Sequence, residues 1–209
     1  FNPTTGCIRS WDNWGPDFPW QYPVIIDNMM NLELLFWAAR ESGDSTFYKI
    51  AVTHADTTMK NHFRPDYSSF HVVDYDTLSG KVLGRQTHQG YADSSAWARG
   101  QAWGLYGFVT CYRFTGDERY LQQAEAIADF ILNHPRLPED MIPYWDFDAP
   151  NIPDEPRDAS AGAIAASALY ELALYSDPKY ADAADRMLAS LSSDSYTACP
   201  LYTSDAADE

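Results

Sequence analysis

The segment from His88 to Trp103 concentrates side chains that can bind or transform a ligand: indoles, an imidazole, a guanidinium, amides and a carboxylate. Trp97 and Trp103 flank Arg99 within this segment. Aromatic faces stack on the C–H faces of a pyranose, and a guanidinium pairs with a carboxylate through two hydrogen bonds, so the pattern suits an anionic sugar. The spacing is equally compatible with Trp97 and Trp103 as aromatic residues of a hydrophobic core.

These side chains are expected at the start of a helix. Residues 93–95 are of types that cap helix N-termini, and an apolar series at helical spacing follows them: Ala98, Ala102, Leu105, Val109 and Tyr112. The sequence therefore predicts a helix from about Ala96 that buries this series. Arg99, Trp103 and Tyr106 share a different face of the same helix.

The composition argues against several classes of partner. A net charge of −16 disfavours nucleic acid and anionic membrane surfaces, so an anionic substrate needs a local basic site. Cys7, Cys111 and Cys199 are odd in number and lack metal-ligand spacing, so neither a disulfide framework nor a metal site is expected. The sequence has no transmembrane run, and it leaves both the oligomeric state and the cellular compartment undecided.

A short turn motif recurs along the chain and predicts its architecture. It reads Gly43-Asp44-x-x-Phe47, then Gly116-Asp117-x-x-Tyr120, then Ser176-Asp177-x-x-Tyr180. Each copy lies between two helical patterns. We therefore expect an all-α chain built from αα-hairpins at about 23–63, 96–134 and 159–192.

The first hairpin is expected to open with a helix over residues 23–42, because proline is favoured at the first helical position. Asp27 then heads an apolar stripe with Met30, Leu34 and Ala38. Burial by Met30 and Leu34 would raise the pKa of Asp27, whereas its place in the first helical turn would lower it. From the residues alone, Asp27 is better explained as a first-turn acid that interacts only with the helix dipole.

Two insertions separate the hairpins. Alternating patterns at 69–75 and 81–86 predict a small β-hairpin insertion around residues 77–80. Residues 134–158 hold six of the thirteen prolines. A loop of this length in a compact domain is usually functional or packed over a site.

The two ends of the chain differ from the repeats. Residues 1–21 form an aromatic segment broken by prolines and glycines, which is expected to line a cleft or to cover a groove between helices; it contains Trp11, Trp14 and Trp20. From about Ser192 the helical pattern stops, and the final residues resemble translated sequencing-adapter sequence. The expected domain is therefore 1–191, followed by a doubtful, non-native tail at 192–209.

Three blocks of sequence together resemble a known family. They are Ile25-Ile-Asp-Asn-Met-Met-Asn-Leu32, His88-Gln-Gly-Tyr91 and Trp97-Ala-Arg-Gly-Gln-Ala-Trp103. In this order they resemble the unsaturated glucuronyl hydrolases, glycoside hydrolase family 88, from about Ser10 to about Leu191. The related unsaturated rhamnogalacturonyl hydrolases carry Asn-Gly where this chain has Gln101-Ala102, which favours the glucuronyl family.

The resemblance implies a fold, a substrate and a reaction. The family fold is a barrel of six αα-hairpins, so this chain is expected to be a partial (α/α)6 barrel, an internal fragment that is inactive alone and lacks a second family Asp before Phe1. The family acts on oligosaccharides left by polysaccharide lyases, which carry an unsaturated uronic acid at the non-reducing end. Hydration of the C4=C5 double bond of that sugar releases the next sugar, and the resemblance implies no cofactor. The family is found in the bacterial cytoplasm or periplasm.

The resemblance also assigns roles to single residues. Asp27 matches the acid that protonates C4 and then acts as a base toward water. Substrate binding falls to His71, Gln89, Trp97, Arg99 and Trp103. Asp93 is interpreted as a helix cap rather than a second acid. Two alternatives stay open: a rhamnogalacturonyl hydrolase with the same chemistry, or a glycan-binding α/α toroid in which Asp27 has no catalytic role.

Overall fold

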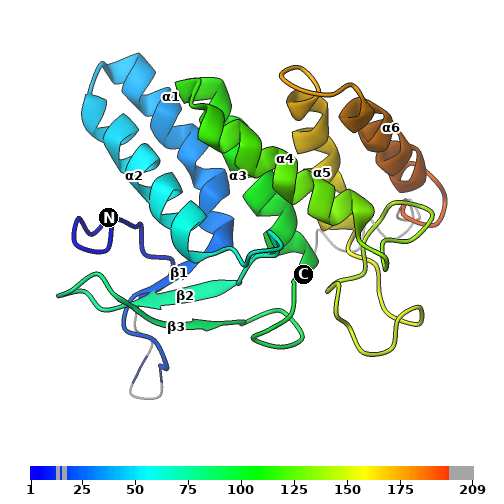
Figure 1. Ribbon diagram of the computed structural model, residues 1–209, viewed down its shortest axis with the longest axis horizontal. Helices are drawn as coiled ribbons and strands as arrows, with labels where there is room; N and C mark the ends of the chain where they lie inside the picture. The colour runs from blue at the N-terminus through cyan, green and yellow to red at the C-terminus, as the bar shows by residue number, and fades with distance from the viewer. Residues whose placement is uncertain (13–14, 16–17, 198–209) are drawn as a thin grey trace, which may run out of the picture.

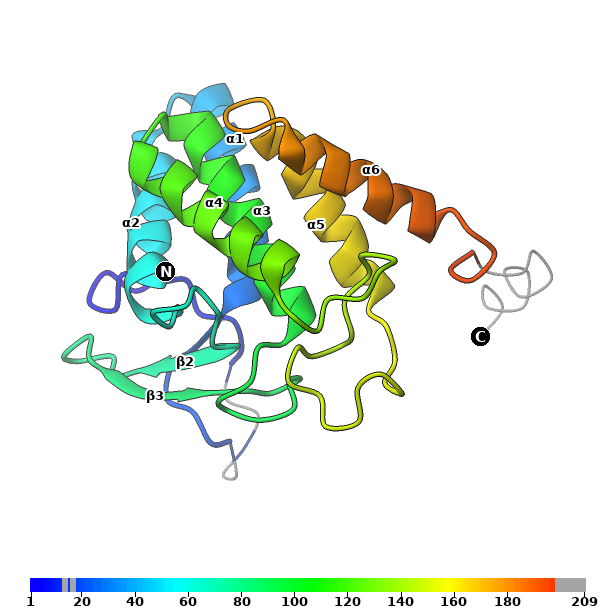
Figure 2. The ribbon, with the colours of Figure 1, turned by 45° about the vertical axis from the view of Figure 1, so that its right-hand side comes forward.

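The computed structural model describes residues 1–12, 15 and 18–197, which form three helical hairpins beside a small sheet (Figures 1 and 2). The helices are α1 (Leu32–Ser42), α2 (Ser45–Asn61), α3 (Ala98–Thr115), α4 (Glu118–Asn133), α5 (Ala159–Leu172) and α6 (Lys179–Leu191). The three predicted αα-hairpins are therefore present. Trp14 and most of the tail, residues 198–209, lie outside the described residues.

The recurring turn motif forms the connection between the two helices of each hairpin. Gly43 and Gly116 end their helices with φ of 72° and 66°, a left-handed conformation that glycine adopts without a steric penalty. Asp44 and Asp117 then cap the next helix, each by accepting a hydrogen bond from the backbone N–H two residues later. Asp177 accepts the equivalent bond before α6. Because these signals act locally, the hairpins were predictable from sequence.

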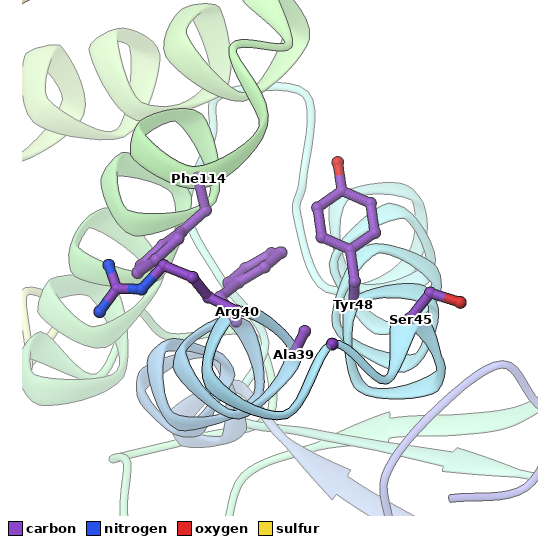
Figure 3. Close-up of a pocket in the computed structure, with 7 residues that line it drawn as sticks. Ala39, Arg40, Ser45, Tyr48 and Phe114 are labelled. Carbon is purple, nitrogen blue, oxygen red and sulfur yellow. The ribbon is translucent and has the colours of Figure 1, made fainter.

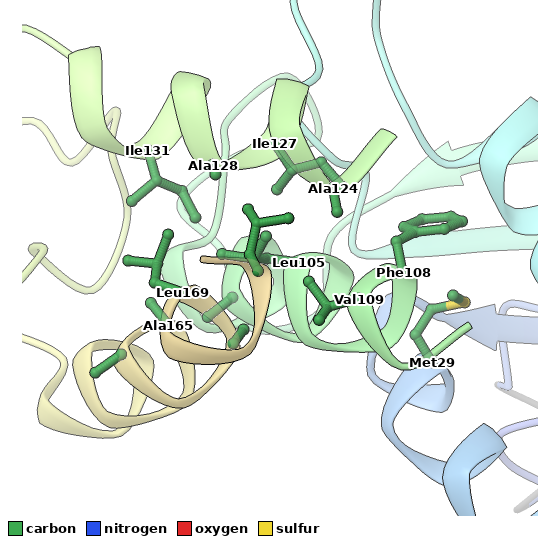
Figure 4. Packing of buried hydrophobic residues seen from close by; sticks show 14 of the residues in the cluster. Met29, Leu105, Phe108, Val109, Ala124, Ile127, Ala128, Ile131, Ala165 and Leu169 are labelled. Atoms are coloured by element: carbon green, nitrogen blue, oxygen red, sulfur yellow. The ribbon is translucent and has the colours of Figure 1, made fainter. Parts of the chain in front are cut away.

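Helix α3 is the centre of the hydrophobic core. It packs against α4, against α5 and against a 3-10 helix, η1 (Ile26–Asn31), that leads into α1. Figure 4 shows the side chains that fill the space between these helices, among them Met29, Leu105, Phe108, Ile127 and Leu169, all fully buried. Burial of each such side chain contributes about 1.5–3 kcal/mol, so this cluster accounts for much of the stability of the fold.

The sheet has three strands rather than the two predicted. Strands β1 (Pro23–Ile25), β2 (Val72–Tyr75) and β3 (Val82–Gln86) are antiparallel in the order β1-β2-β3. The prediction of a helix from Pro23 is therefore wrong over its first residues. Val24 pairs with Val73 and is buried with it in a second, smaller core, and this tertiary pairing overrides the helical pattern.

The predicted apolar stripe below Asp27 is also wrong. Met30 is 38% exposed and Leu34 is 65% exposed. The buried apolar side chains between residues 26 and 32 are instead Ile26, Met29 and Leu32, at a spacing of three residues. That spacing is the period of a 3-10 helix, which turns the stripe away from the face that an α-helix would have buried.

Glycines on α3 allow η1 to approach closely. A Cβ atom at Gly107 would lie 2.3 Å from the Met29 Cβ, and one at Gly100 would lie 2.9 Å from the Ile26 Cγ2. Real Cβ atoms do not approach this closely, so the contact depends on glycine. The face of α3 that carries Gly100 and Gly107 has no side chains there, and we call it the bare face of α3. It fixes the position of η1, and with it the position of Asp27.

Candidate active site

Asp27 and His71 are brought together by the pairing of β1 with β2. Ile25 lies opposite Val72, and the N–H of Ile26 continues the ladder by donating to the carbonyl of His71 at 3.0 Å. Asp27 follows directly in the first turn of η1. The strand that sequence reasoning missed is thus the element that sets the Asp27 carboxylate beside the imidazole of His71.

The two side chains face each other without a direct hydrogen bond. The distance from Oδ2 of Asp27 to Nε2 of His71 is 3.8 Å. Both atoms are buried, and neither has a hydrogen-bond partner within the described part of the chain. Buried polar atoms are normally paired, so two unpaired ones facing each other make Asp27 and His71 a candidate functional pair.

The tautomer of His71 follows from its other nitrogen. Nδ1 of His71 lies 3.1 Å from the backbone N–H of His88 and 3.1 Å from that of Gln89, so it must accept both bonds. The proton of the neutral ring therefore sits on Nε2, the nitrogen that faces Asp27. His71 can donate a hydrogen bond into the site from this position.

Burial shifts the pKa values of Asp27 and His71 in opposite directions. It raises the pKa of Asp27 to about 6, opposed in part by the backbone N–H of Asp27 and by the positive charge of Arg99. It lowers the pKa of His71 to about 3, with further lowering from the nearby His88 and His62. At a pH of about 6, half of the Asp27 carboxyls are protonated, whereas His71 stays neutral and takes up no second proton, so Asp27 has the properties of a general acid.

Arg99 lies in the first turn of α3 and forms an ion pair that the sequence did not predict. Its Nε and Nη2 donate to Oδ2 of Asp158, at 3.1 and 2.9 Å. The guanidinium also lies 5.4 Å from the centre of the Trp97 ring. Within the described residues Nη1 makes no hydrogen bond, and the side chain is 38% exposed. One edge of the guanidinium is thus open to an anionic ligand.

Aromatic rings surround the imidazole of His71. Trp97 lies 4.5 Å from it, between ring centres, and is only 5% exposed, so Trp97 is also a packed residue as the alternative interpretation expected. Trp11 and Trp20 pack around His88 at 5.1 and 5.9 Å. The aromatic N-terminal segment therefore lines the neighbourhood of the site, one of the two places where the sequence placed it.

Two of the expected site residues lie at the margin of this group. The Gln89 side chain is exposed, and its described link to the site is its backbone N–H on His71. Trp103 makes an edge-on contact with Tyr106 at 5.8 Å and lines a hollow of about 300 Å³ between α3 and α5. Among the described residues, no ring contact or hydrogen bond joins Trp103 to Asp27 or His71. The structure thus groups Asp27, His71, Trp97 and Arg99 more tightly than Gln89 and Trp103.

The proline-rich loop at 134–158 binds the segment that precedes α3 through Asp146. Asp146, fully buried, accepts hydrogen bonds from the Tyr91 N–H at 2.9 Å and the Ser95 hydroxyl at 2.7 Å. Arg64 also binds the segment before α3, because its guanidinium donates to the Asp93 carbonyl at 2.9 Å. Sequence reasoning missed both residues, because neither lies within a recognisable motif.

Asp93 does not cap α3. Its carboxylate accepts a hydrogen bond from the Thr87 N–H at 2.8 Å and so closes the loop before the helix. The helix begins at Ala98, and its N-cap residue, Trp97, makes no capping bond with its side chain. The first turn of α3 is instead tied to the long loop, since the Ala98 N–H donates to the Trp145 carbonyl at 3.1 Å.

Other hollows lie away from this group. One of about 350 Å³ lies between α1, α2 and the end of α3, lined by residues that include Ala39, Arg40, Ser45, Tyr48 and Phe114 (Figure 3). It contains none of the expected site residues. Within the described residues, no cluster of His, Cys, Asp and Glu has the geometry to hold a metal ion. In the same residues, no helix combines the length and apolarity that a membrane span requires.

Comparison with known proteins agrees with the fold. No protein-family model matches the sequence. The unsaturated glucuronyl hydrolase of Formosa agariphila is 55% identical over 197 residues, which are 94% of this chain and 49% of that protein. A crystal structure of an unsaturated glucuronyl hydrolase specific for heparin superposes with a TM-score of 0.91 at 56% identity, over 96% of this chain and 53% of the other.

A third relative was solved with a sugar. It is a point mutant of an unsaturated glucuronyl hydrolase from Streptococcus agalactiae in complex with dGlcA-GalNAc6S. It superposes with a TM-score of 0.69 at 39% identity, over 80% of this chain and 45% of the other. The fold is therefore that of α/α-barrel glycoside hydrolases. Within that class, the sequence and structure match the unsaturated glucuronyl hydrolases, and the chain spans about half the length of the curated relatives it matches.

Proposed function

We propose that this chain is the part of an unsaturated glucuronyl hydrolase that carries the proton donor. The observation that supports the proposal most directly is the buried Asp27 carboxyl, whose pKa is raised to about 6 and whose Oδ2 lies 3.8 Å from Nε2 of His71. The substrate is an oligosaccharide with an unsaturated uronic acid at its non-reducing end. The reaction is hydration of the C4=C5 double bond of that sugar.

The chemistry needs one proton donor that can afterwards act as a base. Protonated Asp27 delivers its proton to C4, which places positive charge on C5 and the ring oxygen. Water then adds at C5, and the Asp27 carboxylate takes a proton from that water, which restores the acid. The hemiketal that results opens and releases the neighbouring sugar. The two-carboxylate displacement of ordinary glycosidases is not required.

The other residues of the site bind and orient the uronic acid. The open edge of the Arg99 guanidinium pairs with the sugar carboxylate, because a planar fork matches carboxylate geometry. His71 donates from Nε2 to a sugar oxygen next to Asp27. Gln89 and Trp103, at the margin of the site, contact parts of the sugar farther from the double bond.

The active unit is larger than these residues. The chain supplies three hairpins, and large apolar side chains are exposed on α1 (Leu34 at 65% and Trp37 at 49%), on α5 (Tyr170 at 36%) and just after α5 (Leu174 at 77%). Further hairpins packed on these faces would complete a barrel. We therefore propose residues 1–191 as one segment of a longer catalytic domain.

The test is the absorbance of the conjugated double bond, which is lost on hydration. The full-length protein that contains these residues is expected to consume unsaturated heparin and chondroitin disaccharides and to leave unsaturated rhamnogalacturonyl disaccharides largely unchanged. Saturated disaccharides serve as the control. Turnover of the rhamnogalacturonyl sugars alone would support the related family. Sugar binding without any loss of absorbance would support a glycan-binding protein and contradict the proposal.

A further inference from the structure

The ion pair between Arg99 and Asp158 joins the second and third hairpins at the end where the site lies. We propose that Asp158 is a positioning residue of this site, which fixes the guanidinium of Arg99 and offsets its positive charge toward Asp27. The inference rests on the proposed function for its effect on catalysis. The electrostatic link itself is a property of the protein without substrate.

The geometry makes Asp158 the fixed partner and Arg99 the adaptable one. Oδ1 of Asp158 caps α5 by accepting from the Ala161 N–H at 2.8 Å, and its own N–H donates to the Pro143 carbonyl at 2.8 Å. Its side chain is 4% exposed, against 38% for Arg99. A carboxylate held by its own helix and by the long loop can orient a flexible arginine.

The contact leaves Arg99 able to bind a ligand. Both bonds to Asp158 use a single oxygen and the Nε and Nη2 side of the guanidinium. Nη1 and the second hydrogen of Nη2 form the other edge of the fork, which can take a carboxylate through two bonds. Asp158 thus selects which edge of Arg99 faces the site.

The charge balance around Asp27 gives this pair a second effect. From α3, Arg99 is the permanent charge that lowers the pKa of Asp27, against the larger effect of burial. From the residue just before β2, His71 faces the carboxylate as a neutral ring, and its neighbours His88 and His62 act on that ring. A positive charge favours an ionised carboxyl, and a negative partner weakens that effect. Loss of the Asp158 charge is therefore expected to lower the pKa of Asp27.

The decisive variant is Asp158→Asn. Asparagine caps helices about as well as aspartate, so α5 keeps its cap while the charge opposite Arg99 is lost. Carboxyl carbon NMR of the full-length protein without substrate, with the Asp27 signal assigned by its absence in Asp27→Asn, should show the pKa of Asp27 lower by about half a unit to one unit. The alkaline limb of kcat/KM should move to lower pH by the same amount.

Three further variants make the test specific. The matched control is Asp117→Asn. Asp117 is also an N-cap that pairs with an arginine, Arg119, but it lies beyond the end of α3 that is far from Arg99. This substitution should leave the pKa of Asp27 unchanged. In an Arg99→Gln background, Asp158→Asn should shift the pKa of Asp27 less, because only the direct effect of the lost Asp158 charge remains and the effect through the position of Arg99 is gone. Asp158→Ser, another uncharged cap, replaces Asp158→Asn if that variant folds poorly.

The outcomes separate this inference from the proposed function. An unchanged pKa of Asp27 in Asp158→Asn, or the same shift with and without Arg99, would overturn the positioning role. A pKa shift in a protein that hydrates no unsaturated sugar would uphold the electrostatic link and contradict the proposed reaction instead.

Discussion

The proton of Asp27 depends on a few atoms around it. Burial favours the neutral carboxyl, whereas Arg99 and the backbone N–H of Asp27 favour the charged one, and the balance raises the pKa to about 6. His71 contributes as a neutral donor, since its Nδ1 is occupied by two backbone N–H groups. Acid function therefore falls to Asp27 alone within this pair, and two predictions follow from it.

The first concerns pH. A general acid must be protonated in the free enzyme, and the protonated fraction of Asp27 falls as the pH rises through its pKa of about 6. In the full-length protein, kcat/KM is expected to be greatest below this value and to fall about tenfold per pH unit above it. A pH profile with an unsaturated disaccharide measures this. Activity that rises between pH 6 and pH 8 would contradict the assignment of Asp27 as the acid.

The second concerns substitution of the acid. Asp27→Asn keeps the shape of the side chain but cannot deliver a proton, so turnover should fall at least ~10²-fold while sugar affinity changes little. Asp129→Asn, an exposed carboxylate on α4 that pairs with Lys179, is the matched control and should keep full turnover. Absorbance loss measures turnover, and calorimetry measures affinity. Near-normal turnover of Asp27→Asn would remove Asp27 from the mechanism.

At the scale of elements, the site depends on how closely η1 lies against α3. The Cβ of Met29 would be 2.3 Å from a Cβ at Gly107, and the Met29 backbone would be 3.1 Å away, so a side-chain rotation cannot relieve the contact. Strand β1 fixes the other end of η1 through its pairing with β2. Asp27 is thus held between a sheet and a helix face without side chains.

Gly107→Ala tests this arrangement. Alanine improves helix propensity by about 1 kcal/mol, but overpacking a core costs about 1–3 kcal/mol and here requires a shift of the η1 backbone. We expect a net loss of up to about 2 kcal/mol in the free energy of unfolding and a fall in turnover, because Asp27 moves with η1. Denaturant unfolding measures the first and the absorbance assay the second.

The control is Gly84→Ala in β3, where an added Cβ would meet only the end of the Gln86 side chain, at 3.9 Å. Its free energy of unfolding should change by less than about 0.5 kcal/mol. Equal behaviour of the two variants would show that the close approach of η1 to α3 does not limit stability or activity.

At the scale of the whole molecule, large apolar side chains on or next to α1 and α5 are exposed to solvent. They include Leu34 and Trp37 on α1, Tyr170 on α5 and Leu174 just after α5. Contiguous apolar surface of more than a few hundred Å² promotes association, and a net stability of about 5–15 kcal/mol leaves little margin for missing interfaces. Residues 1–209 expressed alone are therefore expected to self-associate, to unfold without a sharp transition and to lack turnover.

Light scattering, thermal unfolding and the absorbance assay measure these three properties. The control is the full-length protein, which should be a defined species that unfolds cooperatively. A soluble monomer of residues 1–209 with a sharp transition and measurable turnover would contradict the proposal that further hairpins complete the domain.

The sequence by itself determined the hairpins and the candidate side chains. The turns at Gly43-Asp44 and Gly116-Asp117 are local signals, because a left-handed glycine ends one helix and an aspartate starts the next within a few residues. At Ser176-Asp177 the aspartate signal recurs without a glycine. The motif around Trp97 and Arg99 carried the family resemblance, which the comparisons confirm. The β-hairpin was predictable from alternation, for the same local reason.

Tertiary structure decided what lies next to what. The site depends on the pairing of Ile25 with Val72 and on the ion pair of Arg99 with Asp158, whose partners are 59 residues apart in sequence. The apolar spacing below Asp27 predicted an α-helical stripe, but the neighbouring strand and the bare face of α3 favour a 3-10 turn that buries Met29 and exposes Met30. Propensity and periodicity are properties of neighbouring residues, whereas burial, ion pairing and a raised pKa come from segments that only the folded chain brings together.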